Sequence, residues 1–235
     1  MNDKQQKILA WAIIGITFIG LTSFVVIQRR KALGNRVRIK NKNPKKILIV
    51  GDSQSAIKNA NGGKITFTYP NLLQKKYPEK TFDVLAIGGK TTKWMLDNLP
   101  NQLEGKKYDR IYIYGGGNDA SSPTAISQAI SNIQKMVDLS KSNGADVFVN
   151  LGYKIEGTNG KFGNYKIMPL TRYLKKQEDW IPYVEKRIEL QKGLSKEIKG
   201  ANFIPVYDLK QKTTDGIHPT ADGHKLVAEA YINTL

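Results

Sequence analysis

Cysteine is absent from this chain of 235 residues. Its absence excludes disulfide bonds, cysteine-ligated zinc, a cysteine nucleophile and a lipidated N-terminal cysteine. It leaves the cellular compartment open, because a cysteine-free protein can occur on either side of a membrane.

Histidine is scarce, with only His218 and His224 in the chain. Because histidine is the side chain best suited to act as a base near neutral pH, few positions could carry such chemistry. Glycine is plentiful, but the run 115–117 belongs to no G-x-G-x-x-G motif and has no Walker lysine. The sequence therefore does not indicate a phosphate-binding loop.

Acidic residues are nearly absent from the first 46 positions, which hold one acid against eleven lysines and arginines. This segment carries more than half of the net charge of +17. Within it, residues 8–27 contain no charge of either sign. A helix of that length rises about 30 Å, which matches the hydrocarbon core of a bilayer.

The sequence thus predicts an N-terminal transmembrane anchor over residues 1–28, with Trp11 near one interface. A cleaved signal peptide is the main alternative, but the apolar run is longer than usual and no A-x-A-like site follows it. A buried helix of a soluble protein is a third possibility.

A basic linker is predicted over residues 29–45, which could contact anionic headgroups or serve as a spacer. Nine lysines and arginines lie in residues 29–46 and two precede the apolar run. The positive-inside rule then predicts a single-pass membrane protein with its C-terminal part in the cytoplasm, and an extracytoplasmic location is the alternative. The membrane accounts for the basic excess, so no nucleic-acid partner is expected.

Beyond the linker, apolar β-branched runs alternate with segments of helical periodicity. Strands are predicted over residues 46–50, 82–87, 109–114, 145–151 and 201–207. Helices are predicted over residues 69–77, 92–99, 123–142, 180–198 and 220–233, with Pro100 ending the second and Ser122 capping the third.

Strands that alternate with helices form a parallel sheet covered on both faces. We therefore predict an α/β domain over residues 46–235, a three-layer α/β/α sandwich with a five-stranded parallel sheet of doubly wound type. Residues 153–180 do not fit the alternation and are predicted to be an insertion near the site.

Four polar segments follow the predicted strands, at residues 51–53, 88–89, 116–119 and 215–219. Active residues of such sheets collect beyond the carboxyl ends of the strands. Ser53 can act as a nucleophile only with a base, and His218 has Asp215 three residues before it to orient its ring. His224 has Asp222 nearby, but its place in the last helix favours a capping or packing role.

These segments resemble the four sequence blocks of the SGNH/GDSL hydrolase family, over residues 46–235. Gly51-Asp52-Ser53 is similar to the first block, Ala86 to Thr92 to the second, Gly116 to Asp119 to the third, and Asp215 to His218 to the last. The departures are Gln54, where the family usually has an aliphatic residue, and the second block, which lacks its usual Asn and has Gly88 where serine is common. They separate the chain from the best-known lipase and thioesterase branches.

The resemblance implies a flavodoxin-like sandwich and a serine hydrolase. Ser53 would be the nucleophile, Asp215 and His218 the acid and base, and the Ser53 N–H, Gly89 and Asn118 the oxyanion hole. Neither a metal nor a cofactor would be needed. The implied substrates are lipid esters, thioesters or acetyl esters of carbohydrate.

The alternative function is a membrane-tethered binding or structural module on the same scaffold, without catalysis. Ser53 alone could be a turn residue, and Asp52 and Asp119 are expected to be structural. Five aromatic residues could line a substrate groove or belong to the core: Trp94, Tyr153, Phe162, Tyr165 and Trp180.

Overall fold

The computed structural model describes residues 37–58, 62–154, 177–210 and 212–235. The predicted anchor, residues 29–36 of the linker, and the greater part of the insertion with Phe162 and Tyr165 lie outside these residues. Within the described ranges, no helix has both the length and the apolar character needed to cross a bilayer. Residues 39–235 form one compact unit.

The sheet has five parallel strands, as predicted, and their order is β2-β1-β3-β4-β5. They are β1 (Lys46–Gly51), β2 (Thr81–Ala86), β3 (Arg110–Tyr114), β4 (Asp146–Asn150) and β5 (Asn202–Ile204). Every residue of β3 and β4 is buried, which explains why residues 111–114 and 147–149 are unbroken runs of apolar and aromatic residues rather than alternating with charged ones.

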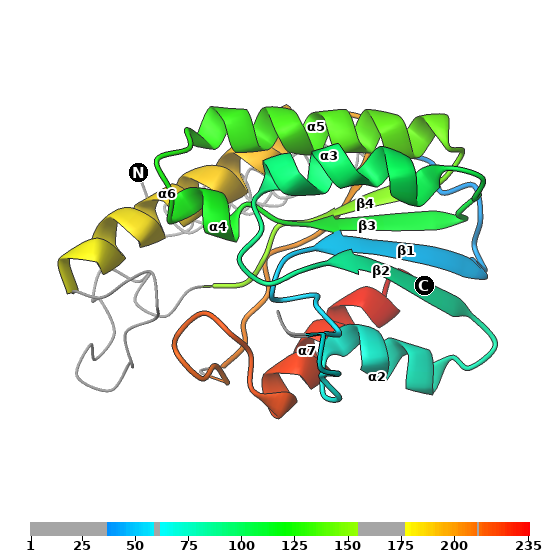
Figure 1. Cartoon of the computed structure of the whole chain (residues 1–235), viewed down its shortest axis with the longest axis horizontal. Coiled ribbons are helices and arrows are strands. Elements are labelled where there is room, and N and C mark those ends of the chain that lie inside the picture. The colour runs from blue at the N-terminus through cyan, green and yellow to red at the C-terminus, as the bar shows by residue number, and fades with distance from the viewer. Residues whose placement is uncertain (1–36, 59–61, 155–176, 211) are drawn as a thin grey trace, which may run out of the picture. The chain divides into compact units, whose positions relative to one another are not determined.

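Helices cover both faces of the sheet (Figure 1). On one face lie α3 (Thr92–Leu103), α5 (Ile126–Ser142), α6 (Gln177–Glu197) and the one-turn helix α4 (Gly117–Ala120). On the other face, α2 (Tyr69–Lys76) packs beside α7 (Ala221–Ile232). The predicted three-layer arrangement is confirmed.

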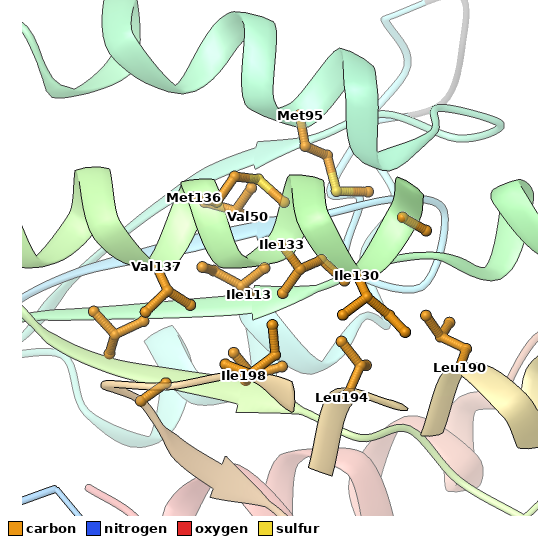
Figure 2. Packing of buried hydrophobic residues seen from close by; sticks show 14 of the residues in the cluster. Val50, Met95, Ile113, Ile130, Ile133, Met136, Val137, Leu190, Leu194 and Ile198 are labelled. Carbon is orange, nitrogen blue, oxygen red and sulfur yellow. The ribbon is translucent and has the colours of Figure 1, made fainter. Parts of the chain in front are cut away.

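The larger core lies between the sheet and the layer of α3, α5 and α6 (Figure 2). Residues of α5 spaced three and four apart, such as Ile130, Ile133 and Val137, point into it because this spacing repeats one face of a helix. Leu190 and Leu194 of α6 meet them.

The prediction that Pro100 ends helix α3 is wrong, since the helix continues to Leu103. Proline removes one backbone hydrogen bond, yet Leu99 is fully buried and Leu103 packs against the core. The Glu104 N–H closes the last turn on the carbonyl of Pro100 at 3.0 Å. Apolar burial of the last turn therefore outweighs the lost hydrogen bond.

Helix α5 begins at Ile126, three residues later than predicted, and Ser122 is not its cap. The Ser122 hydroxyl instead donates to the carbonyl of Asp119 at 2.9 Å, at the end of the short helix α4. Strand β5 is also shorter than predicted and ends at Ile204, because Pro205 has no N–H to continue the ladder.

Arg110 lies at the amino edge of the sheet, where β3 begins. Gly51, which ends β1, lies at the opposite, carboxyl edge. The side chain of Arg110 is almost fully buried and donates to the carbonyls of Asn41, at 2.7 Å, and Thr234. The guanidinium also lies over the ring of Phe148, 5.0 Å from its centroid. Residues near both ends of the compact unit are thereby held at one edge.

Two residues of α5 differ in burial, so their substitution by alanine should differ in its effect on stability. Ile133→Ala should lower the free energy of unfolding by about 2–5 kcal/mol, because Ile133 is fully buried and the smaller side chain leaves a cavity. Leu139→Ala is the matched control, since Leu139 is 36% exposed, and should change it by less than about 1 kcal/mol. Urea unfolding of both variants measures the difference, and equal losses would contradict the assigned core.

Candidate active site

Ser53 lies in the turn that follows β1, at the carboxyl edge of the sheet. The turn is closed by the Ser55 N–H, which donates to the carbonyl of Asp52 at 3.0 Å. The Asp52 side chain accepts the Gln54 N–H at 3.0 Å. At Gly51, a Cβ atom would lie 2.4 Å from the Ser55 hydroxyl, so this tight turn requires glycine. The turn leaves Ser53 half-buried, which lets a substrate reach it.

Asp215 and His218 lie in the loop between β5 and α7. One oxygen of Asp215 accepts the backbone N–H groups of Ile217, at 3.0 Å, and His218, at 2.7 Å. The Thr214 N–H donates to the His218 carbonyl at 2.7 Å. The loop is thus a closed turn with the carboxylate at its centre.

The structure brings Ser53, His218 and Asp215 into one line of hydrogen bonds. The Ser53 Oγ lies 2.9 Å from His218 Nε2, and His218 Nδ1 lies 2.7 Å from the second oxygen of Asp215. Ser53 and His218 are 165 positions apart in the chain. This is the arrangement in which a histidine can take a proton from a serine while a carboxylate orients the ring.

The charges of the pair agree with that arrangement. Burial opposes ionisation of Asp215, but hydrogen bonds from the His218 side chain and from backbone N–H groups lower its pKa. The hydrogen bond to Asp215 raises the pKa of His218 against the opposing effect of burial. Because the carboxylate can only accept, Nδ1 carries the proton in the neutral ring and Nε2 is left to accept from Ser53.

Gly89 and Asn118, the two other predicted residues, line the same cavity as Ser53 and His218. Gly89 has a φ of 78°, so of the two glycines after β2 it is the one in the left-handed region. Asn118 is on α4, where its amide donates one hydrogen to the carbonyl of Lys90 at 2.8 Å. That bond orients the amide and leaves its second N–H available.

The cavity also contains residues that the sequence motifs did not single out as site residues. The complete lining is Asp52, Ser53, Gln54, Gly89, Gly117, Asn118, Ser121, Tyr183, Arg187, Ile217 and His218. Tyr183 and Arg187 come from α6 and lie one helical turn apart on one face. Arg187 falls at a core-facing position of the pattern that continues with Leu190 and Leu194, which could have identified it from the sequence.

Arg187 is a buried cation next to the nucleophile turn. Its side chain is 4% exposed, and a Cβ atom at Gly117 would lie 2.5 Å from one guanidinium nitrogen. Burial raises the pKa of the Asp52 carboxyl, while the Gln54 N–H and the Arg187 charge act in the opposite direction. Arg187 thus supplies positive charge near both Asp52 and the turn that carries Asn118.

Asp119 and His224 have structural contacts, as expected. Asp119 is fully buried and accepts the backbone N–H and the hydroxyl of Thr92 at 3.0 and 2.7 Å. His224 accepts the N–H of Tyr69 at 3.3 Å, and burial, together with the charge of His218, lowers its pKa to about 4.

Of the five aromatic residues that could line a groove or belong to the core, the two whose side chains the structure describes lie in or against the core. Trp94 packs against the core, and Tyr153 is 1% exposed beneath the site. Neither lines the cavity, whose aromatic residue is Tyr183. The side chain of Trp180 lies outside the described residues. The described ranges also contain no cluster of three or more histidine, aspartate or glutamate side chains suited to a metal ion.

Solved structures with the same fold include several hydrolases. One described as TesA is 24% identical, with a TM-score of 0.56, and the match covers 81% of this chain and 98% of that one. The esterase EstA from Pseudoalteromonas is 17% identical, with a TM-score of 0.52 and coverage of 81% and 96%. An acetyl xylan esterase, AlAXEase, is 16% identical, with a TM-score of 0.55 and coverage of 81% and 99%. At these identities the likeness concerns the fold.

Among curated proteins, none matches this sequence. The GDSL-like Lipase/Acylhydrolase family does match, over residues 49–226, which is most of the chain and includes Ser53, Gly89, Asn118, Asp215 and His218. This chain belongs to the GDSL-like lipase/acylhydrolase family and is an ester-hydrolysing enzyme.

Proposed function

We propose that this protein is a serine esterase that cleaves carboxylic esters through a covalent acyl-enzyme on Ser53. The observation that carries the proposal is the line of hydrogen bonds from Ser53 through His218 to Asp215, with Ser53 and His218 lining a cavity. A serine hydroxyl needs such a base to become a nucleophile at neutral pH.

In the proposed mechanism, Ser53 Oγ attacks the ester carbonyl and His218 Nε2 takes the hydroxyl proton. The oxyanion is stabilised by the N–H groups of Ser53 and Gly89 and by the Asn118 amide. His218 then donates its proton to the departing alcohol, which leaves the acyl group on Ser53. Water, deprotonated by His218, attacks the acyl-enzyme and releases the acid, and the proton returns to Ser53. No step needs a metal or a cofactor.

The proposed substrates are acetyl esters of carbohydrate or acyl esters of lipids. The presence of an acetyl xylan esterase among the structures of the same fold is compatible with the first class. We further propose that residues 8–27 anchor the enzyme in a membrane, beside the basic segment 29–46, and that the positive-inside rule places the catalytic domain in the cytoplasm. The alternative of a tethered binding module without catalysis is not proposed, because the family match identifies an ester-hydrolysing enzyme.

Removing the nucleophile should abolish ester hydrolysis. Ser53→Ala in the full chain is expected to lower the rate on p-nitrophenyl acyl esters by about 10⁴- to 10⁶-fold, because no other group can form the acyl-enzyme. A fluorophosphonate probe should label the unmodified protein at Ser53, detected by mass spectrometry, and should not label the variant.

Ser195→Ala is the matched control, since Ser195 is exposed and its hydroxyl donates to the carbonyl of Lys192 in its own helix. It should keep full activity and full labelling. Hydrolysis at equal rates in the Ser53 variant and the control, or no hydrolysis of short- or long-chain esters together with no labelling, would contradict the acyl-enzyme on Ser53.

Asn118→Ala tests the oxyanion hole. Loss of one donor to the developing charge should reduce kcat by about 10²- to 10³-fold with little change in KM. Steady-state kinetics measure the two constants. Asn101→Ala, at an exposed position of α3, is the control and should have normal kcat. A change confined to KM would show that Asn118 binds the ground state instead.

The activity should fall in acid with an inflection above pH 6.5. Since Asp215 raises the pKa of His218 above its ordinary 6.5, the protonated, inactive imidazolium persists to higher pH than in a free histidine. Activity is therefore full above the raised pKa and is lost as the pH falls through it. A profile of kcat/KM against pH measures the inflection. An inflection below 6.5, in protein that circular dichroism shows to be folded, would contradict the Asp215–His218 pairing.

A further inference from the structure

The carbonyl of Ile217, the residue directly before His218, accepts hydrogen bonds from two buried side chains. Gln54 Nε2 donates to it at 2.8 Å, and the Tyr153 hydroxyl donates to it as well. Gln54 is 5% exposed and Tyr153 is 1% exposed. Neither side chain takes part in the hydrogen bonds that join Ser53, His218 and Asp215. Both donate to the carbonyl of the peptide group between Ile217 and His218.

Gln54 connects the two turns whose side chains must meet. It follows Ser53 directly, and its backbone N–H is fixed by the Asp52 carboxylate at 3.0 Å. Its side chain spans to the loop of His218, 163 positions away in the chain. Tyr153 reaches the same carbonyl from the segment after β4, and its oxygen lies 3.4 Å from Gln54 Nε2. Parts of the chain that follow three different elements thus converge on one carbonyl oxygen.

Stability alone does not explain an amide at position 54. Gln54 Oε1 is buried and has no hydrogen-bond partner among the described residues, so the side chain pays a desolvation penalty that an apolar residue would avoid. The Nε2 donor to Ile217 is the contact that an aliphatic side chain could not make. What the amide adds at position 54 is therefore the hydrogen bond to the loop that carries His218.

We propose that Gln54, together with Tyr153, is a positioning residue that holds the Ile217–His218 peptide so that His218 Nε2 faces Ser53 Oγ. The inference rests on the proposed roles of Ser53 and His218. The Asp215 carboxylate accepts the N–H groups of the same two residues, Ile217 and His218. Gln54 and Tyr153 donate to the Ile217 carbonyl, so the loop is held through both its N–H groups and its carbonyl. A shift of even about 1 Å at His218 would lower the rate substantially.

A double-mutant cycle tests the proposal in the full-length protein. Gln54→Met keeps the length and volume of the side chain and removes the donor, and Tyr153→Phe removes only the hydroxyl. Each is expected to lower kcat by about 10-fold with KM changed less than about twofold. The double variant should lose more than the product of the two single losses, because each single variant leaves the carbonyl one donor. Gln134→Met is the matched control, since that amide binds the carbonyl of Lys199, and its kcat should be normal.

Histidine NMR gives a second measurement that does not depend on a substrate. The chain contains only two histidines, so His218 can be followed with His224 as an internal reference. In the Gln54 and Tyr153 variants the pKa of His218 should fall toward 6.5, because a loosened loop weakens its bond to Asp215, and the pKa of His224 should not change. A general loss of structure would move both.

Normal kcat and an unchanged His218 pKa in folded variants would overturn the proposal, and so would a change confined to KM, which would make Gln54 a substrate-binding residue. If the unmodified protein hydrolyses no ester, the proposed function fails. The histidine titration still decides whether Gln54 and Tyr153 hold the loop, so the two failures can be told apart.

Discussion

The proposed mechanism depends first on the hydrogen bond between His218 Nδ1 and Asp215. At 2.7 Å from a carboxylate, Nδ1 must carry the proton, which leaves Nε2 as the acceptor that faces Ser53. The same carboxylate binds the backbone N–H of His218, so it fixes both the ring and the peptide that bears it. In the proposed mechanism, the other parts of the site act on this pair, either by bringing Ser53 to it or by stabilising the charge that follows proton transfer.

Much of this architecture could be predicted from local sequence. Buried parallel strands require continuous apolar runs, and the five runs indicated both the sheet and its edge of polar residues. The choice of the base was also narrow. The chain has two histidines, and only His218 combines a preceding aspartate with a place outside a helix. Ser53 and His218 could be paired across 165 positions because parallel strands carry all their carboxyl ends to the same edge.

The parts that could not be predicted depend on contacts between distant segments. Pro100 stands inside a helix because Leu99 is fully buried and Leu103 packs against the core, which local propensity does not reveal. The spacing of Arg187, Leu190 and Leu194 indicates that Arg187 faces the core, but its place in the cavity is known only from the packing of α6 beside α4 and α5. Gln54 was recognised as unusual, but its partner at Ile217 is known only once the two turns are placed together.

Arg110 gives the fold a property unrelated to catalysis. Because one guanidinium binds the carbonyls of both Asn41 and Thr234, the beginning and the end of the compact unit are neighbours at the edge away from Ser53. A short peptide could join them, and the chain could be opened at a surface turn such as the one that contains Gly105, without changing the order of strands in the sheet. The fold is therefore suited to circular permutation, with new termini placed at an exposed turn of this kind.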